Sequence, residues 1–476
     1  MSWETVIGLE THVQLSTKTK LFSRASTAFG ESPNTNVNLT DCGLPGVLPS
    51  VNKEAFYKAI RFGIAVDAQI NQTSIFDRKN YFYPDLPKGY QITQMDLPIV
   101  LGGSIEIAID NSMKTINITR AHLEEDAGKS IHDQFDGYSA IDLNRAGTPL
   151  LEIVSEPEIS NAKEAVAYMK VMHQLVTYLD VSDGNMAQGS LRCDANVSIR
   201  KKGDSELGTR TEIKNINSFK FIEKAINYEI KRQIKILENG KKVVQETRLY
   251  DSVKDETRPM RSKEFANDYR YFPEPDLLPV VISNQEMQDI KDNFPELPKD
   301  KEARFEKDFK LSSYDSKILA SSKSMADFFE DASKKTKNYS LLSNWMIGEI
   351  SAFLNKEAIE INESKLIPSN IAMLINRIDD QTISGKIGKS IFEEMCSTGE
   401  SPDQIIESQG LRQLSDDGEI EKLIDAVIED HSKQVAAYLD GKEKLFGFFV
   451  GQVMKLTAGK ANPETVNKIL KEKLKK

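Results

Sequence analysis

The sequence predicts an α+β fold, with an antiparallel sheet in the first part of the chain and helices in the rest. Up to about residue 282, apolar and polar residues alternate with the period of two that is typical of half-buried strands. Short turns join most of these segments, which favours antiparallel pairing over a doubly wound parallel sheet. The alternating segments are Thr5–Leu15, Ser104–Asp110, Thr115–Leu123, Ser190–Arg200 and Gly208–Lys214.

Helices are expected both inside and after the strand-rich part. Asn161–Leu179 and Asn217–Glu238 interrupt the strands with apolar residues at helical spacing. Ser369 or Asn370 is expected to cap the helix that follows Pro368. The last helix is expected to begin at Asn462, because asparagine favours the N-cap and a proline follows it. The other predicted helices are Ile318–Phe329, Leu341–Phe353, Asn370–Arg377 and Ser390–Met395.

The length of the chain predicts several domains. With 476 residues it is too long for one hydrophobic core. The polar, proline-punctuated segment 293–301 is typical of a junction, and a second boundary is expected near residues 399–402. We therefore expect a catalytic sheet domain over residues 1–292, a helical domain over 293–405 and a helical tail domain over 406–476.

Composition and net charge exclude several classes of protein. Residues are 39% hydrophobic and 28% charged, and no apolar run approaches the roughly 18 residues that span a bilayer. The N-terminus reads directly into a strand and the three cysteines lie far apart, so we expect a cytoplasmic protein without disulfides or membrane contact. A net charge of −10 argues against a protein that coats nucleic acid. Residues 441–476, with nine lysines and three glutamates, form either a solvated helix or a small footprint for RNA phosphates.

Three predicted strands carry a polar face of unusual composition. Like-facing neighbours on a strand are about 7 Å apart, so each face forms a row of groups. A connection between residues 201 and 208 would fold the last two strands into a hairpin that brings Asp194 and Glu212 to one face. Such a face is by default solvated, but these short and directional groups suit metals and anions. The rows are Glu10, His12 and Gln14; Ser190, Arg192, Asp194, Asn196 and Ser198; and Arg210, Glu212 and Lys214.

Two further segments are candidates for binding. Glu124, Glu125 and Asp126 follow one another, and packing them together requires a cation or solvent between them. Gly128-Lys129-Ser130 imitates the end of a phosphate-binding loop, but Leu123 stands where that motif needs glycine, so a Walker A motif is excluded. Residues 76–94 mix tyrosines with cations and prolines, which suits a nucleotide or an RNA end as well as a packed connection.

These segments together resemble the B-subunit family of the aspartyl/glutamyl-tRNA amidotransferases, also called the GatB/GatE family. The resemblance covers essentially the whole chain, and its many motifs occur in the family's order. They are Ile7–Leu15, Gly43–Pro49, Phe76–Asp85, Leu123–Ser130, Asp142–Ile153, Gly189–Ser198, Glu212–Phe219, Asp268–Asp276, Gly447–Lys455 and Gly459–Pro463.

The resemblance implies a fold, an activity and partners. The sheet domain is expected to be a cradle distantly similar to glutamine synthetase, followed by two all-α modules, the last similar to YqeY. The activity is that of a ligase with glutamine as amido donor. ATP and Mg²⁺ (Mn²⁺ being an alternative) phosphorylate the side chain of Glu-tRNA(Gln) or Asp-tRNA(Asn), and ammonia completes the amide. The expected partners are an amidase, which frees the ammonia, and a small third protein, which together form a heterotrimer with this chain. The misacylated tRNA is the remaining partner.

Site residues follow from the family's motifs, position by position. The resemblance assigns metal binding to Glu10, His12, Glu124, Glu125, Asp194 and Glu212. It assigns contacts with phosphate or ATP to Lys79, Lys129, Arg192 and Lys214. Lys79, Tyr81, Tyr83, Ser190, Arg192, Asn196 and Lys214 are the residues expected to act in catalysis. His12 is the least typical magnesium ligand of the set, since Mg²⁺ prefers oxygen, and it would suit Mn²⁺ or orient a bound water.

The sequence departs from the family in one respect. Many relatives carry two cysteine pairs, near Phe22 and before Gly43, that resemble a zinc site, whereas this chain has only Cys42 there. We therefore expect no structural zinc. Two rival functions stay open, a free-standing ATP-dependent ligase for a small amino acid and a non-catalytic tRNA-binding scaffold. The choice between Glu-tRNA(Gln) and Asp-tRNA(Asn) depends on the cell's synthetases.

Overall fold

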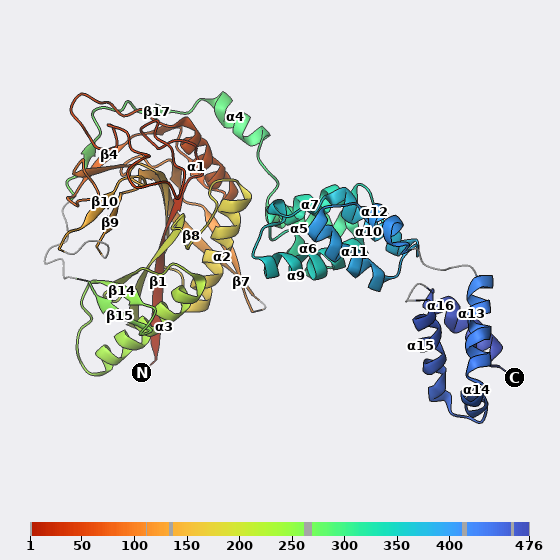
Figure 1. Cartoon of the computed structure of the whole chain (residues 1–476). Coiled ribbons are helices and arrows are strands. Elements are labelled where there is room, and N and C mark those ends of the chain that lie inside the picture. Colours follow the sequence, from red (N-terminus) through yellow and green to blue (C-terminus); the bar gives the residue numbers. More distant parts are fainter. Residues whose placement is uncertain are drawn as a thin grey trace. The chain divides into compact units, whose positions relative to one another are not determined.

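The computed structural model of the chain is shown in Figure 1 and describes residues 2–110, 112–132, 137–260, 269–411, 417–457 and 461–475. Asp268, Gly459 and Lys460 of the family motifs lie outside these residues. The chain divides into two compact units, Met1–Leu297 and Pro298–Lys476. Each unit is described by itself.

The first unit is built on a large mixed sheet. Among the described strands, neighbours pair antiparallel except for β13 and β14, which are parallel. The antiparallel-rich α+β architecture is thus confirmed, with one parallel pair that the sequence did not predict. Across the sheet the order is β15 (Glu256–Pro259), β14 (Thr247–Asp251), β13 (Thr211–Lys214), β12 (Leu191–Lys201), β1 (Trp3–Gln14), β11 (Pro149–Ser155), β8 (Ser112–Glu125), β5 (Tyr90–Thr93), β4 (Asp77–Asn80) and β16 (Phe272–Pro273).

Shorter strands complete the first unit. β2 (Gln69–Ile70) pairs with β6 (Val100–Leu101), and both β6 and β7 (Ser104–Ile109) pair with β8. Two small sheets are formed by β9 (Lys129–Ile131) with β10 (Ala140–Asp142), and by β3 (Thr73–Ser74) with β17 (Val280–Val281).

One face of the large sheet is covered by helices. α2 (Ala162–Tyr178) and α3 (Phe219–Glu238) lie side by side against it, and α1 (Lys53–Ala65) packs on β8 (Figure 1). On β1, Ile7, Leu9 and Val13 point to this side and are buried in the core. The opposite face of the same strands carries the polar residues, so a functional site is expected on that face. α4 (Asn284–Asp292) follows the sheet.

The two long helices on the sheet begin with capping residues. Asn161 accepts the Glu164 N–H at the start of α2, and Ser218 accepts the Phe221 N–H at the start of α3. Each cap satisfies a backbone donor that has no partner within its helix. Both helices lie within the ranges predicted from their apolar spacing.

In its described residues, the second unit consists mainly of helices and contains two separate hydrophobic clusters. One gathers residues between Phe305 and Ile406, the other residues between Ile420 and Leu474. No helix of the described residues is both long and apolar enough to cross a membrane. The helices are α5 (Pro298–Phe309), α6 (Ser313–Leu319), α7 (Lys323–Ser333), α8 (Tyr339–Trp345), a π-helical turn (Met346–Ile350), α9 (Ser351–Glu357), α10 (Pro368–Asp379), α11 (Gly385–Thr398), α12 (Pro402–Gln409), α13 (Asp417–Asp430), α14 (Ser432–Leu439), α15 (Phe446–Leu456) and α16 (Pro463–Lys473).

Two predictions for these helices were wrong, and the predicted N-cap of the last helix was confirmed. Residues 318–329 do not form one helix: α6 ends at Leu319 and α7 restarts after Ser322, whose hydroxyl caps it by accepting the Met325 N–H. Neither Ser369 nor Asn370 is a cap, because α10 begins at Pro368, a residue that needs no N–H partner. Asn462 caps the last helix as predicted and accepts the N–H groups of Glu464 and Thr465.

Candidate active site

Strand register assembles a polar site on the face of the sheet opposite the helices. On β1, Glu10, His12 and Gln14 alternate with the buried apolar residues. Asp194 of β12 stands opposite Glu10 on one side, and Glu152 of β11 stands opposite His12 on the other. Because like-facing residues of paired strands meet, β12, β1 and β11 contribute to one surface.

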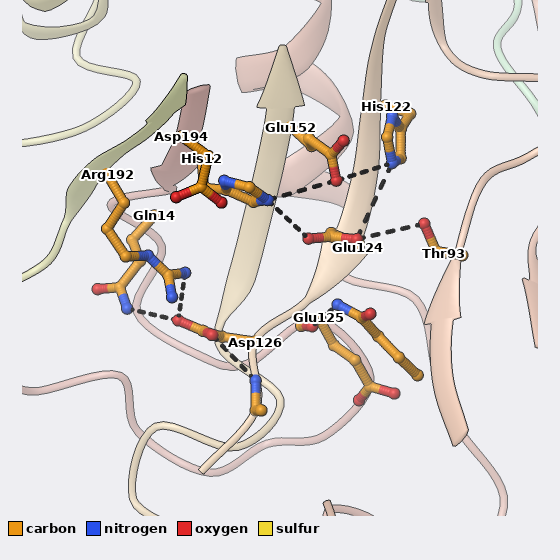
Figure 2. A network of polar contacts seen from close by, with 12 residues as sticks. His12, Gln14, Thr93, His122, Glu124, Glu125, Asp126, Glu152, Arg192 and Asp194 are labelled. Atoms are coloured by element: carbon orange, nitrogen blue, oxygen red, sulfur yellow. Dashed lines mark hydrogen bonds and ion pairs between the residues drawn. The ribbon is translucent and has the colours of Figure 1, made fainter. Parts of the chain in front are cut away.

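The first acidic group consists of His12, Glu124 and Glu152, with His122 beside it (Figure 2). His12 Nε2 lies 3.4 Å from Glu152 Oε2 and 3.9 Å from Glu124 Oε1. His122 Nε2 lies 3.6 and 3.9 Å from the same two carboxylates. Potential ligand atoms of the three residues all lie within 4.8 Å of one another, a spacing that suits one cation.

Burial and mutual repulsion perturb this group. Burial and the neighbouring Glu152 raise the pKa of Glu124 to about 7. Burial opposes protonation of His12, but its hydrogen bond with Glu152 and the charge of Glu124 outweigh this effect and raise the pKa of His12 to about 9. Burial lowers the pKa of His122 to about 4, so this imidazole is neutral at pH 7. The carboxylates of this group therefore favour a positive charge beside them, which His12 supplies in its protonated form.

The second acidic group consists of Glu10, Asp194 and Glu212, whose ligand oxygens also lie within 4.8 Å of one another. The prediction that Asp194 and Glu212 meet on one face is confirmed. Lys214 Nζ lies 2.5 Å from Asp194 Oδ2 and 2.9 Å from Glu212 Oε1. Asn196 donates to Glu10 Oε1 at 2.9 Å. Burial, and then the charges of Glu152, Glu212 and Asp194, raise the pKa of Glu10.

Arg192 is held at the edge of the site by Asp126. Its Nη2 donates to Asp126 Oδ2 at 2.9 Å, and Gln14 Nε2 donates to the same oxygen at 2.9 Å (Figure 2). Although burial opposes ionisation, Arg192 and Arg145 keep the pKa of the Asp126 carboxyl below its usual range. The arginine is thereby fixed in direction, with its side chain still 31% exposed.

Lys79 reaches the site from β4 and has no carboxylate partner among the described residues. Within the described part of the chain, no acidic oxygen lies within the 4.0 Å of an ion pair. The ammonium instead faces the rings of Tyr269 and Tyr81, with centroids at 5.1 and 6.0 Å. Burial opposes its charge, but Glu124 and Glu152, with Tyr271, raise the pKa of Lys79 above its usual value. It therefore remains charged and available to an anionic ligand.

The tyrosines around Lys79 form a small aromatic cluster. Tyr81 contacts Tyr83 and Tyr269 edge to face, with centroids 5.9 and 6.0 Å apart, and Tyr269 contacts Tyr271 in the same way. Tyr81 also donates to Gln91 Oε1 at 3.3 Å. Burial and the acidic groups raise the pKa of Tyr81, so its hydroxyl is neutral.

The structure does not gather Glu124, Glu125 and Asp126 around one cation, as the sequence suggested. β8 runs to Glu125, so neighbouring residues point to opposite faces. Glu125 forms an ion pair with Lys88 and accepts the Ile92 N–H at 2.9 Å, away from both acidic groups. Because Lys88 balances its charge, Glu125 has no need of a cation.

A cavity of about 450 Å³ adjoins the site. Gln14, Ser190, Lys129 and Arg145 line it, together with the loop around Phe29. Ser190 is mostly buried and lies just before β12, whereas Lys129 begins β9. Two residues assigned from the sequence thus face this cavity rather than the acidic groups.

Sequence reasoning missed Glu152 of the first acidic group and His122 beside it. Glu152 is the one carboxylate in the apolar strand Pro149–Ser155, and this isolated charge was the available signal. His122 alternates with Glu124 on β8 and stands opposite Glu152. The pairing of β11 with both β1 and β8 joins segments about 30 and 140 residues apart in sequence, which alternation alone does not reveal.

The segments around residues 20 and 41 are joined by an ion pair. Lys20 Nζ lies 2.9 Å from Asp41 Oδ2, and both side chains are buried. The ammonium also donates to the Leu143 carbonyl at 3.3 Å. This contact ties the segments around residues 20 and 41 to the loop that lines the cavity.

Comparison with known proteins agrees with the family that the motifs indicate. A family model of the GatB/GatE catalytic domain matches residues 5–288, and one of a GatB domain matches residues 327–474. Proteins named as the B subunit of aspartyl/glutamyl-tRNA(Asn/Gln) amidotransferase are similar over their whole length and that of this chain. They are 58% identical in Vesicomyosocius okutanii, 57% in Ectopseudomonas mendocina and 58% in Thioalkalivibrio sulfidiphilus. The chain therefore belongs to the GatB/GatE family, the B subunits of the aspartyl/glutamyl-tRNA(Asn/Gln) amidotransferase ligases.

Proposed function

We propose that the chain uses ATP to phosphorylate the side-chain carboxyl group of glutamate or aspartate on a mischarged tRNA, and that the product is then amidated. The main observation in support is the pair of acidic groups on one face of the sheet, with the Lys79 ammonium directed to the same face. Phosphoryl transfer requires positive charge around the transferring group, which bound cations and lysines supply. The names of the full-length relatives support the more general activity, which is tRNA-dependent amidation.

The proposed chemistry has two steps. An oxygen of the substrate carboxylate attacks the γ-phosphorus of ATP, ADP leaves, and an acyl phosphate forms. Ammonia then attacks the carbonyl carbon, inorganic phosphate leaves with one former carboxylate oxygen, and the nitrogen loses a proton. The products are Gln-tRNA(Gln) or Asn-tRNA(Asn). The first step supplies the leaving group that a carboxylate lacks.

The residues of the two acidic groups fit divalent cations. Glu10, Asp194 and Glu212 offer only oxygens, as Mg²⁺ prefers. His12, Glu124 and Glu152 combine an imidazole with carboxylates, a set that Mn²⁺ accepts more readily than Mg²⁺ does. Bound cations would neutralise the phosphate oxygens during transfer. The raised pKa values of Glu124 and Glu10 support this assignment, since a buried carboxylate that resists ionisation gains most from a cation.

The cationic side chains are assigned different roles according to the residues that they contact. Lys79, held between tyrosine rings, is assigned to the substrate carboxylate or the γ-phosphate. Lys214 forms ion pairs with Asp194 and Glu212, and its ammonium would be free to meet phosphate if a divalent cation balanced those carboxylates. Arg192, oriented by Asp126, is assigned to phosphate. Lys129 and Ser190 line the adjoining cavity, which we assign to the nucleotide. Tyr81, Tyr83 and Asn196 are assigned to the lining of the substrate pocket.

The partners and modules are proposed from the family. A partner amidase releases ammonia from glutamine, and a small third protein completes a heterotrimer. The sheet domain is a cradle distantly similar to glutamine synthetase, which fits the activation of a carboxyl group before amidation. The tail, with its own cluster of buried residues and its basic end, contacts the tRNA.

Substrate and nitrogen source test the proposal together. With its partner proteins, ATP, Mg²⁺ and glutamine, the chain is expected to amidate Glu-tRNA(Gln) or Asp-tRNA(Asn) but neither free glutamate nor uncharged tRNA. The chain alone is expected to use ammonium and not glutamine, because glutamine hydrolysis requires an activated nucleophile. The measurement is the amino acid recovered from the tRNA, with ADP release followed in parallel.

The other outcomes select the rival functions. Amidation of free glutamate would show a free-standing ligase. Tight binding of tRNA with no ADP released by the assembled complex would show a scaffold. Efficient use of glutamine by the chain alone would contradict the division of labour between the chain and its amidase partner.

A further inference from the structure

Thr247 contacts the second acidic group from a neighbouring strand. Its Oγ1 donates to Glu212 Oε2 at 2.6 Å, while Lys214 Nζ lies 2.9 Å from the other oxygen, Oε1. The parallel pairing of β13 and β14 sets this contact, because it places Thr247 opposite Glu212. Glu212 N–H also donates to the Glu246 carbonyl at 3.1 Å, which fixes the backbone beside the contact.

The other face of β14 is anchored by a buried charge network. Arg248, next to Thr247, donates to the hydroxyl and the carbonyl of Thr257 at 2.8 and 2.6 Å. Thr257 in turn donates to Glu229 of α3, which is fully buried. Glu229 also accepts from Arg232 and Gln233 at 2.7 and 2.8 Å. A strand held this firmly presents the Thr247 hydroxyl in a fixed position.

We infer that Thr247 is a positioning residue, whose hydroxyl holds the Glu212 carboxylate in the direction that lets Glu10, Asp194 and Glu212 bind one divalent cation. The inference rests on the proposed function of that group. A glutamate has three side-chain torsions, and a hydrogen bond from outside the group limits them before the ligand arrives. Hydrogen bonds of this kind to metal-binding carboxylates typically change affinity by about 10- to 100-fold.

The test is a titration of the full-length chain with Mn²⁺, followed by electron paramagnetic resonance. Thr247→Val keeps the β-branched shape that suits a strand and removes only the hydroxyl. We expect the Mn²⁺ dissociation constant of one site to rise about tenfold or more, with little change in Tm. Thr247→Ser, which restores a hydroxyl, is expected to recover most of the affinity.

Two further variants make the result decisive. Thr119→Val removes a Thr–Glu hydrogen bond of similar length, 2.8 Å to Glu156, on β8 outside both acidic groups, and is expected to leave Mn²⁺ binding unchanged. Glu212→Gln is expected to weaken the same site as Thr247→Val. If Glu212→Gln weakens binding and Thr247→Val does not, the positioning role is wrong and the cation site stands. If neither variant changes binding, both the site and the inference are wrong.

Discussion

Asp194→Asn and Glu124→Gln are each expected to lower the rate of amidated-tRNA formation by about 10²-fold or more, by analogy with the loss of a main electrostatic stabiliser. Each substitution keeps the size of the side chain and removes one negative charge, from the second and the first acidic group respectively. A weaker cation leaves the phosphate charges unbalanced during transfer. The measurement is the rate of product formation by the assembled complex.

The control for these variants is Glu156→Gln. Glu156 follows β11, four residues after Glu152, and accepts a hydrogen bond from Thr119 at the surface. Its substitution is expected to leave the rate unchanged. Glutamine hydrolysis by the partner amidase is expected to stay measurable in all three variants. Near-normal amidation by Asp194→Asn and Glu124→Gln would show that neither group binds a catalytic cation.

Lys79→Met is expected to lower the same rate by about 10²-fold or more, since the variant loses a charge directed at the transferring group. Methionine retains much of the side-chain length between the Tyr81 and Tyr269 rings but has no ammonium. Because Lys79 has no carboxylate partner within 4.0 Å among the described residues, its removal leaves no broken ion pair to destabilise the fold. The loss is expected in the rate, with little change in Tm.

Lys53→Met is the matched control. Lys53 is ion-paired with Glu286 at 2.7 Å and is 64% exposed on α1. This variant is expected to keep the normal rate. An unchanged rate for Lys79→Met would show that its ammonium does not meet the substrate or the phosphate. A large fall in Tm would show instead a structural role for the aromatic cluster.

Local patterns predicted the strands and the faces of their residues. The alternation around residues 7–15 and 190–199 placed Glu10, His12, Arg192, Asp194 and Asn196 on polar faces, and the structure places them there. These predictions succeed because one face of each strand must enter the core, which fixes the other face as well.

The same reasoning failed where it treated neighbours in sequence as neighbours in space. Glu124 and Glu125 lie on opposite faces because the strand continues two residues beyond its predicted end at Leu123. Consistent application of the alternation would have separated them. The phosphate contact that the resemblance assigns to Lys214 stays a prediction, and β13 lies beside β12 and brings its ammonium to Asp194 and Glu212.

Contacts between segments that are distant in the chain could not be predicted from the sequence. Nothing in the residues around Glu152 indicates that β11 lies between β1 and β8, and the first acidic group exists only because of that order. Tyr269 reaches Lys79 because β16 pairs with β4, a contact between segments almost 200 residues apart. Such long-range pairings depend on the whole core rather than on local patterns.

The most direct test of carboxyl activation follows the oxygen atoms of the substrate. Glu-tRNA(Gln) labelled with ¹⁸O in both side-chain carboxylate oxygens is incubated with the assembled complex, ATP, Mg²⁺ and glutamine. If the chain phosphorylates the carboxylate, each amide formed releases one inorganic phosphate that carries one ¹⁸O atom, and Asp194→Asn greatly slows its appearance. Mass spectrometry of the phosphate measures this transfer. Amide formation with unlabelled phosphate would show that the carboxylate never bonds to phosphorus and would contradict the proposed function.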